Sequence, residues 1–212
     1  MKRVRLDPTR SALLVIDVQN DFCASGTLEV KGGEEVVPII NNLMPHFGQV
    51  FLTQDWHPRG HLSFASSHTD AQPFQEIETP YGRQTLWPDH CIQGTRGADT
   101  HPLLLTHPVR TILRKGMNHQ IDSYSAFFEN DRKTSTGLGG LLTELGIREL
   151  FLAGLATDFC VLYSAMDARR LGFDVVLVQD ACRAVDREDS LQRALNQMGK
   201  AGVLFARSRQ IV

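Results

Sequence analysis

The chain has 212 residues, of which 42% are hydrophobic and 22% are charged, the usual mixture of a globular protein. Its 22 basic and 24 acidic residues leave a formal net charge of -2, and no run of lysine or arginine indicates a groove for nucleic acid. The longest apolar run, Leu150–Ala156, is far shorter than the roughly 20 residues of a membrane-spanning helix. These features exclude disordered, fibrous and membrane-spanning classes. They predict one domain over residues 1–212, with neither nucleic acid nor a membrane as partner.

The N-terminus and the cysteines indicate the compartment. The basic start of the chain is followed by an apolar run of only five residues, Ala12–Ile16, which is too short for a signal peptide. The four cysteines are far apart and form no CxxC motif, so we expect free thiols at Cys23, Cys91, Cys160 and Cys182. We therefore expect a cytoplasmic protein.

Short apolar runs alternate with longer segments of helical period along the chain. The runs predict six strands, at Ala12–Ile16, Val50–Thr53, Thr111–Leu113, Leu150–Ala153, Val175–Val178 and Val203–Phe205. The helical periods predict helices over Glu34–Phe47, from an N-cap at Thr157 or Asp158 to Leu171, and over Asp189–Lys200. Continuous rather than alternating apolar strands are typical of a parallel sheet that helices cover on both faces. The expected fold is a three-layer α/β/α domain with a six-stranded, mainly parallel sheet.

Polar residues follow directly after four of the predicted strands. Ligands in open parallel sheets bind beyond the carboxyl ends of the strands, so residues at these positions are expected to meet along one edge. Asp17 follows the first strand, Lys115 the third, and Cys160 lies a few residues after the fourth. Singly, a strand-end aspartate is often a helix cap, a lysine a surface residue and a cysteine a buried hydrophobe. Together, they predict a catalytic site.

Cys160 is the candidate nucleophile. It lies near the start of a predicted helix, where the helix dipole and a neighbouring Lys115 would favour its thiolate form. Asp17 can accept the thiol proton and later donate a proton to a leaving group. The strand-to-helix turn also offers the N–H groups of Ala156 and Cys160 as an oxyanion hole. This combination indicates acyl transfer.

A second group of polar residues lies in the irregular segment from Asp55 to His107. In extended backbone, Asp55 and His57 point the same way and can bind one ion, with His90 completing the site. One carboxylate and two imidazoles suit one divalent metal, with zinc first and iron or manganese as alternatives. His61 is an additional candidate ligand. No G-x-S-x-G turn occurs, and the glycines after Thr136 lack the pattern of a dinucleotide loop.

Six segments of the chain, taken in order, resemble the successive motifs of nicotinamidases in the isochorismatase-like hydrolase superfamily. They are Leu13–Phe22 (LLVIDVQNDF), Gln54–Pro58 (QDWHP), Leu86–Cys91 (LWPDHC), Arg114–Gly116 (RKG), Asp122–Phe127 (DSYSAF) and Gly154–Val161 (GLATDFCV). The order and spacing match from about residue 10 to about residue 206.

This resemblance implies the isochorismatase-like hydrolase fold, an activity and residue roles. The activity is hydrolysis of nicotinamide to nicotinate and ammonia through a cysteine thioester, in the salvage route to NAD, with pyrazinamide as a further substrate. The implied catalytic residues are Asp17, Lys115 and Cys160, the implied metal ligands Asp55, His57 and His90, and the implied pocket residues Phe22, Leu28, Trp87 and Tyr124. The metal would hold the pyridine nitrogen. A cis peptide bond before Ala156 is also implied.

Four other functions remain as alternatives. An isochorismatase-type enzyme would lack the metal ligands, and an N-carbamoyl amidase would need polar contacts for a ureido group. A metal-binding or sensing protein without catalysis would have an ordinary thiol at Cys160. A metal-dependent phosphoesterase would tolerate the loss of Cys160. The sequence leaves open whether the chain forms an oligomer.

Overall fold

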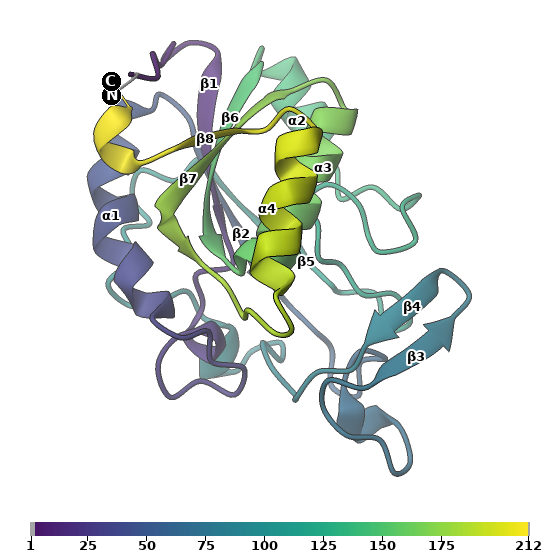
Figure 1. The fold of residues 1–212 in the computed structure, drawn as a ribbon. Coiled ribbons are helices and arrows are strands. Elements are labelled where there is room, and N and C mark those ends of the chain that lie inside the picture. The colour runs from purple at the N-terminus through teal and green to yellow at the C-terminus, as the bar shows by residue number, and fades with distance from the viewer. Residues whose placement is uncertain (1–2, 212) are drawn as a thin grey trace.

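The computed structural model describes residues 3–211. In this part of the chain, six strands form one sheet in the order β5-β2-β1-β6-β7-β8, and every pairing in it is parallel (Figure 1). The strands are β1 (Ser11–Ile16), β2 (Val50–Asp55), β5 (Thr111–Lys115), β6 (Glu149–Leu155), β7 (Asp174–Arg183) and β8 (Leu204–Ala206). The predicted α/β fold with a six-stranded sheet is confirmed.

Helices cover both faces of the sheet. Helix α1 (Val36–Leu43) lies on one face, and α2 (Leu138–Glu144), α3 (Leu162–Arg170) and α4 (Ser190–Lys200) lie on the other (Figure 1). Alternate residues of β1 supply the two cores, since Leu13 and Val15 pack with α1 whereas Leu14 and Ile16 pack on the opposite side. All six residues of β1 are buried, which explains its continuous apolar run.

Two predicted helices have irregular ends. Helix α1 is flanked by 3-10 turns at Gly33–Glu35 and Met44–His46, which together span most of the predicted segment. The helix predicted from residue 157 begins as a turn of π-helix, Thr157–Val161, and becomes α-helical only at Leu162. None of the helices described within residues 3–211 is long and apolar enough to cross a membrane.

One helix and one hairpin of two strands were not predicted. Helix α2 has only seven residues, two of them glycine, so its sequence has too few positions to reveal a helical period. Strands β3 (Glu76–Thr79) and β4 (Gly82–Thr85) form an antiparallel hairpin that stands away from the main sheet (Figure 1). Most hairpin residues are exposed or half-buried, so they do not show the apolar pattern of a core strand. The hairpin lies within the segment predicted to be irregular.

The order of the strands determines where the functional residues meet. The chain enters the sheet at β1, adds β2 and β5 on one side, and then returns to add β6, β7 and β8 on the other. The direction of winding changes between β1 and β6, and in this class of sheet the crevice at such a point binds ligands. Asp17 follows β1 and Cys160 follows β6, so both lie at this crevice.

Candidate active site

Asp17 lies directly after β1 in a left-handed backbone conformation, with a φ of 48°. The side chain is fully buried, and its Oδ1 accepts a hydrogen bond of 2.6 Å from the Thr53 hydroxyl. Its Oδ2 lies 2.9 Å from Lys115 Nζ in an ion pair that lacks hydrogen-bond geometry, so this oxygen can accept another proton. Burial raises the pKa of Asp17, and the Lys115 charge only partly opposes that shift.

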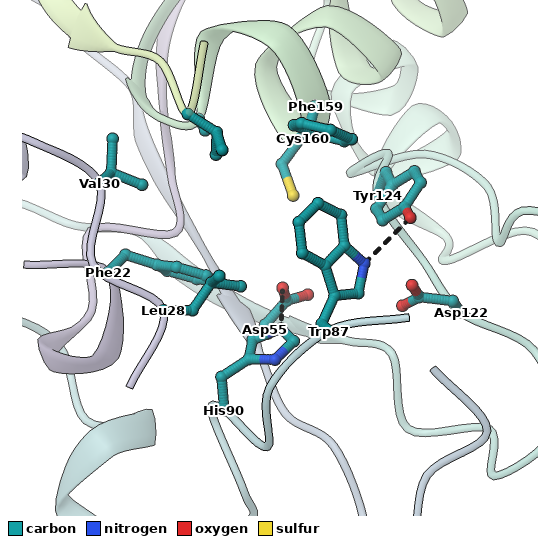
Figure 2. A pocket seen from close by; sticks show the side chains of 12 residues that line it. Phe22, Leu28, Val30, Asp55, Trp87, His90, Asp122, Tyr124, Phe159 and Cys160 are labelled. Atoms are coloured by element: carbon teal, nitrogen blue, oxygen red, sulfur yellow. Dashed lines mark hydrogen bonds and ion pairs between the residues drawn. The ribbon is translucent and has the colours of Figure 1, made fainter. Parts of the chain in front are cut away.

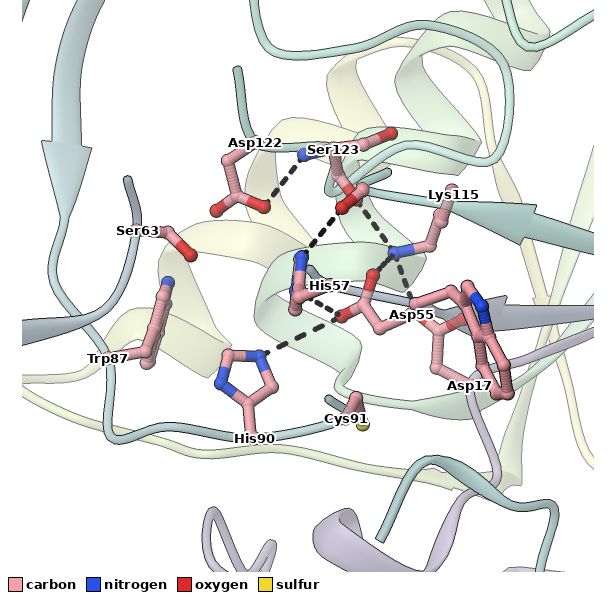
Figure 3. Close-up of polar contacts among 12 residues, drawn as sticks. Asp17, Asp55, His57, Ser63, Trp87, His90, Cys91, Lys115, Asp122 and Ser123 are labelled. Atoms are coloured by element: carbon pink, nitrogen blue, oxygen red, sulfur yellow. Dashed lines mark hydrogen bonds and ion pairs between the residues drawn. The ribbon is translucent and has the colours of Figure 1, made fainter. Parts of the chain in front are cut away.

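Lys115 is the last residue of β5, and its ammonium group is enclosed by acceptors (Figure 3). Besides the ion pair with Asp17, Nζ donates to Asp55 Oδ1 at 2.5 Å and to the Ser123 carbonyl at 2.7 Å. Nζ also lies 3.5 Å from the sulfur of Cys160. Burial would lower the pKa of Lys115, but Asp17 and Asp55 raise it well above its usual range. The side chain is therefore a fixed cation between two carboxylates.

Cys160 lies in the π-helical turn after β6, and its side chain is buried. The sulfur and one carboxylate oxygen each of Asp17 and Asp55 lie within 4.8 Å of one another. Burial raises the pKa of Cys160 well above its usual range despite the Lys115 charge, which is opposite to the stabilised thiolate that the sequence predicted. Formation of the thiolate therefore depends on a nearby base.

Two further features surround this turn. The Leu155–Ala156 peptide bond is cis, as the resemblance implied. The N-cap prediction was wrong, because Ala156 occupies the cap position and no side chain caps the turn. The Asp158 carboxylate instead accepts hydrogen bonds from the backbone N–H of Val185 at 3.0 Å and of Asp186 at 2.8 Å. Asp158 therefore anchors the loop after β7 beside the turn that carries Cys160.

Asp55, His57 and His90 form a buried cluster beside the catalytic candidates (Figure 3). The Nε2 atoms of His57 and His90 lie 3.7 Å and 4.0 Å from Asp55 Oδ2. The Nδ1 atoms of these histidines pair instead with carbonyl oxygens, His57 with Gly116 at 2.9 Å and His90 with Pro88 at 2.8 Å. Carbonyl partners at Nδ1 hold the proton there and leave Nε2 as a lone-pair donor, the arrangement common around metal-binding histidines. These donors fit a divalent metal.

The pKa shifts within the cluster follow from its burial and charges. Burial would raise the pKa of Asp55, but Lys115 and the histidines lower it below its usual range. Burial lowers the pKa of His90 to about 4, whereas Asp55 raises the pKa of His57 above its usual value despite the burial of that ring. Neutral imidazole and ionised carboxylate are the forms that bind metals. Asp55 contacts both Lys115 and the histidines, so it joins two groups that the sequence analysis treated as separate.

His61 packs against His57 with 4.3 Å between ring centroids, but its ring nitrogens are both engaged. Nδ1 pairs with the Ser63 hydroxyl at 2.8 Å and Nε2 with the Asn118 carbonyl at 2.9 Å. His57, His61 and Asp122 also have donor atoms within 4.8 Å of one another. The contacts of His61 support a role in holding His57 rather than membership of the Asp55-His57-His90 cluster.

A pocket opens over Cys160 (Figure 2). The four predicted pocket residues, Phe22, Leu28, Trp87 and Tyr124, all line it, together with Asp55, His90 and Ala156. The indole Nε1 of Trp87 donates a hydrogen bond of 3.1 Å to the Tyr124 hydroxyl. The walls are largely aromatic and aliphatic and the floor is polar, which suits a small planar ligand with one reactive polar group.

Comparison with known proteins identifies the family of this chain. The model of the isochorismatase domain matches residues 11–210. The chain belongs to the isochorismatase family. A nicotinamidase of Acinetobacter baylyi is 49% identical to it over 201 residues, which cover 95% of this chain and 94% of that protein.

Solved structures of the same family superpose on the whole fold. A nicotinamidase/pyrazinamidase of Acinetobacter baumannii has a TM-score of 0.95 and 48% identity, covering 96% of this chain and 99% of that one. PnC1 of L. infantum in complex with nicotinate has a TM-score of 0.88 and 40% identity, covering 99% and 98%. The pyrazinamidase of Pyrococcus horikoshii in complex with zinc has a TM-score of 0.76 and 28% identity, covering 93% and 99%.

Four further residues, to which the sequence predicted no individual role, line the pocket in this isochorismatase fold. They are Val30, Asp122, Phe159 and Val185. Phe159 precedes the candidate nucleophile, and its ring meets that of Trp87 edge-on at 4.8 Å. Asp122 is the first residue of the DSYSAF motif, so its place in that motif could have indicated that it lines the pocket. Val30 and Val185 lie in loops without any chemical motif and could be found only from the fold.

Proposed function

We propose that this protein is a nicotinamidase, which hydrolyses nicotinamide to nicotinate and ammonia and also deamidates pyrazinamide. The observation that carries the proposal is the contact of the Cys160 thiol with Lys115, close to Asp17, at the floor of an aromatic pocket beside a metal-type cluster. A nucleophile, a base and a cation suffice for acyl transfer. The aromatic walls and the adjacent Asp-His-His donors match a planar pyridine ring with a nitrogen atom.

The first half of the reaction forms a thioester. Asp17 removes the proton of the Cys160 thiol, and the sulfur attacks the carboxamide carbon to give a tetrahedral intermediate. The C–N bond then breaks as Asp17 returns the proton to the departing nitrogen, which leaves as ammonia. The pKa values of Asp17 and Cys160 are both raised, so the ionised form of each group readily takes up a proton. This property suits a reaction in which one proton is passed between them.

The second half of the reaction releases nicotinate. Asp17 removes a proton from a water molecule, and the resulting hydroxide attacks the thioester carbon. The C–S bond then breaks, and Asp17 returns the proton to the sulfur, which restores the thiol of Cys160. The backbone N–H groups of Ala156 and Cys160 are the proposed oxyanion hole in both halves. Ala156 lines the pocket directly before the turn that carries Cys160, which supports this assignment. Lys115 stabilises the ionised forms of Asp17 and Cys160.

Asp55, His57 and His90 are the proposed ligands of one divalent metal, zinc first, with iron or manganese as alternatives. When bound, the metal supplies a Lewis-acid contact for the pyridine nitrogen. The chain itself contributes the stacking of Phe22 and Trp87 on either side of the ring and the position of the carboxamide over Cys160. We also propose a cytoplasmic location, which the four free cysteines support.

An assay of ammonia release from purified protein tests the function. Nicotinamide is the expected substrate, benzamide is a ring control without the nitrogen, and an N-carbamoyl amino acid tests the related amidase chemistry. Turnover of nicotinamide at least tenfold faster than that of either other compound is expected. Preferential turnover of the N-carbamoyl compound, or no turnover of any amide by metal-loaded protein, would contradict the proposal.

A further inference from the structure

Gln84 is a fully buried amide on a hairpin whose other residues are exposed or half-buried. It lies in β4, and its exposed fraction is 0%. A buried polar side chain is costly unless hydrogen bonds satisfy it, so its partners indicate why it is there. Two of these partners, Asp122 and Tyr124, line the pocket that contains Cys160.

The amide nitrogen of Gln84 faces the pocket wall. Nε2 donates to Asp122 Oδ2 at 2.8 Å, to the Thr85 carbonyl at 2.8 Å and to the Tyr124 hydroxyl at 3.1 Å. The amide has two hydrogens, so these three acceptors share them. The Tyr124 oxygen also accepts the hydrogen bond from Trp87 Nε1, so the orientation of this ring-flanking indole depends on the same hydroxyl.

The amide oxygen of Gln84 faces away from the pocket. Oε1 accepts hydrogen bonds from Asn130 Nδ2 at 3.2 Å and from the Tyr81 hydroxyl at 3.3 Å. Asn130 in turn accepts the backbone N–H of Tyr124 at 3.0 Å. The two ends of one amide therefore connect the hairpin to the segment that supplies Asp122 and Tyr124.

We propose that Gln84 is a positioning residue that sets the ring-binding wall of the pocket through its bonds to Asp122 and Tyr124, and through Tyr124 to Trp87. It does not touch the reacting atoms. This inference rests on the proposed function for its kinetic consequence, because the wall is argued to hold the pyridine ring. Loss of the amide should loosen substrate binding while leaving Cys160, Asp17 and Lys115 unchanged.

The test compares Gln84→Leu with a matched control in the same strand, Arg83→Leu. The Arg83 side chain is 74% exposed, and its ion pairs are with Glu76 and Glu78 of the same hairpin. Gln84→Leu should raise KM for nicotinamide about tenfold or more and change kcat by less than about threefold. Alkylation of Cys160 by iodoacetamide should keep its native rate. Arg83→Leu should leave all three quantities unchanged. An unchanged KM in Gln84→Leu, or a parallel fall in alkylation rate, would overturn the proposal.

A second readout does not depend on turnover. The two tryptophans give two indole N–H signals in a nitrogen-correlated NMR spectrum, and Gln84→Leu should shift that of Trp87 but not that of Trp56. If wild-type protein fails to hydrolyse nicotinamide but the Trp87 signal still shifts, the proposed function fails while the connection from Gln84 to Trp87 stands. If the Trp87 signal does not move, the positioning role fails by itself.

A second variant separates positioning from folding. Gln84→Glu keeps the acceptor for Asn130 and Tyr81 but loses the donor to Asp122 and Tyr124, so at neutral pH it should raise KM at least as much as Gln84→Leu. Repulsion between the new carboxylate and Asp122 adds to the effect. If Gln84→Leu does not fold, Gln84→Glu decides alone. If the NMR spectra of both variants lose the chemical-shift dispersion of a folded protein, Gln84 is a fold-stabilising residue and the proposal is wrong.

Discussion

The ammonium of Lys115 lies 2.9 Å from the carboxylate of Asp17, and both side chains are fully buried. Because Lys115 also pairs with Asp55, one cation compensates two buried carboxylates. Removing one partner of a buried ion pair leaves a charge without compensation, which costs about 3–5 kcal/mol. Lys115 is therefore expected to matter for stability as well as for chemistry.

Lys115→Met should lower the free energy of unfolding by about 3–5 kcal/mol, as measured by urea denaturation. The Lys115 charge lowers the pKa values of Cys160 and Asp17, so its removal should raise both. The midpoint of Cys160 alkylation against pH should consequently move to higher pH. The exposed Lys133→Met is the control and should change neither quantity. An unchanged alkylation profile in Lys115→Met would mean that Lys115 does not act on the thiol.

Cys160→Ala should reduce nicotinamide turnover on the order of 10³-fold or more, because no other group can form the thioester. Metal content and the circular dichroism spectrum should stay native. Cys182→Ala is the control, since Cys182 is also a buried free thiol but does not line the pocket that contains Cys160. Its turnover should stay within about twofold of the native value. More than a few per cent of residual turnover in Cys160→Ala would rule out the covalent mechanism.

Turnover should fall as the pH drops through the pKa of Asp17, because only the ionised carboxylate can accept the thiol proton. Burial raises this pKa, so the fall should begin at a higher pH than for an ordinary aspartate. Asp17→Asn keeps the shape but cannot accept a proton, and we expect no turnover at any pH. The profile of kcat/KM against pH measures both effects. An Asp17→Asn variant with native-like turnover would assign the base elsewhere.

Removal of the metal should separate substrate binding from nucleophile reactivity. In His57→Ala or chelator-treated protein, nicotinamide turnover should collapse because the ring loses its anchor. Iodoacetamide, which needs no anchor, should label Cys160 at close to the native rate. Benzamide should be a poor substrate whose turnover depends little on the metal. Equal losses for nicotinamide and benzamide, with labelling unchanged, would contradict the anchoring role.

Gly116→Ala should weaken metal binding about 10–100-fold, as measured by competition with a chelator. Gly116 has a φ of 66°, and a Cβ atom there would lie 2.5 Å from Cε1 of His57, whose Nδ1 pairs with the Gly116 carbonyl. Gly137→Ala is the matched control, because that residue also has a positive φ but no atom within 4 Å of the added Cβ. It should cost stability alone. Native metal affinity in Gly116→Ala would mean that His57 tolerates the displacement.

Local sequence determined the strands of the sheet, because residues buried on both faces must be apolar at consecutive positions. The predicted runs ending at Ile16 and at Ala153 lie in adjacent strands, as the parallel fold requires. The residues that follow those runs were identified for the same reason, since the carboxyl ends of parallel strands share one edge. The resemblance of six motifs then supplied their implied roles.

Tertiary structure alone decided the burial of each polar group, since burial depends on residues far apart in the chain. The sequence favoured a thiolate at Cys160 from one helix end and one lysine, whereas the folded environment raises its pKa. Likewise, nothing near Gln84 marks it as different from its exposed neighbours. Its role arises from hydrogen bonds to Asp122 and Tyr124, about 40 residues later in the sequence. The local hydrophobic pattern predicts whether a segment is buried. The hydrogen-bond partner of a buried polar atom, however, depends on the tertiary structure.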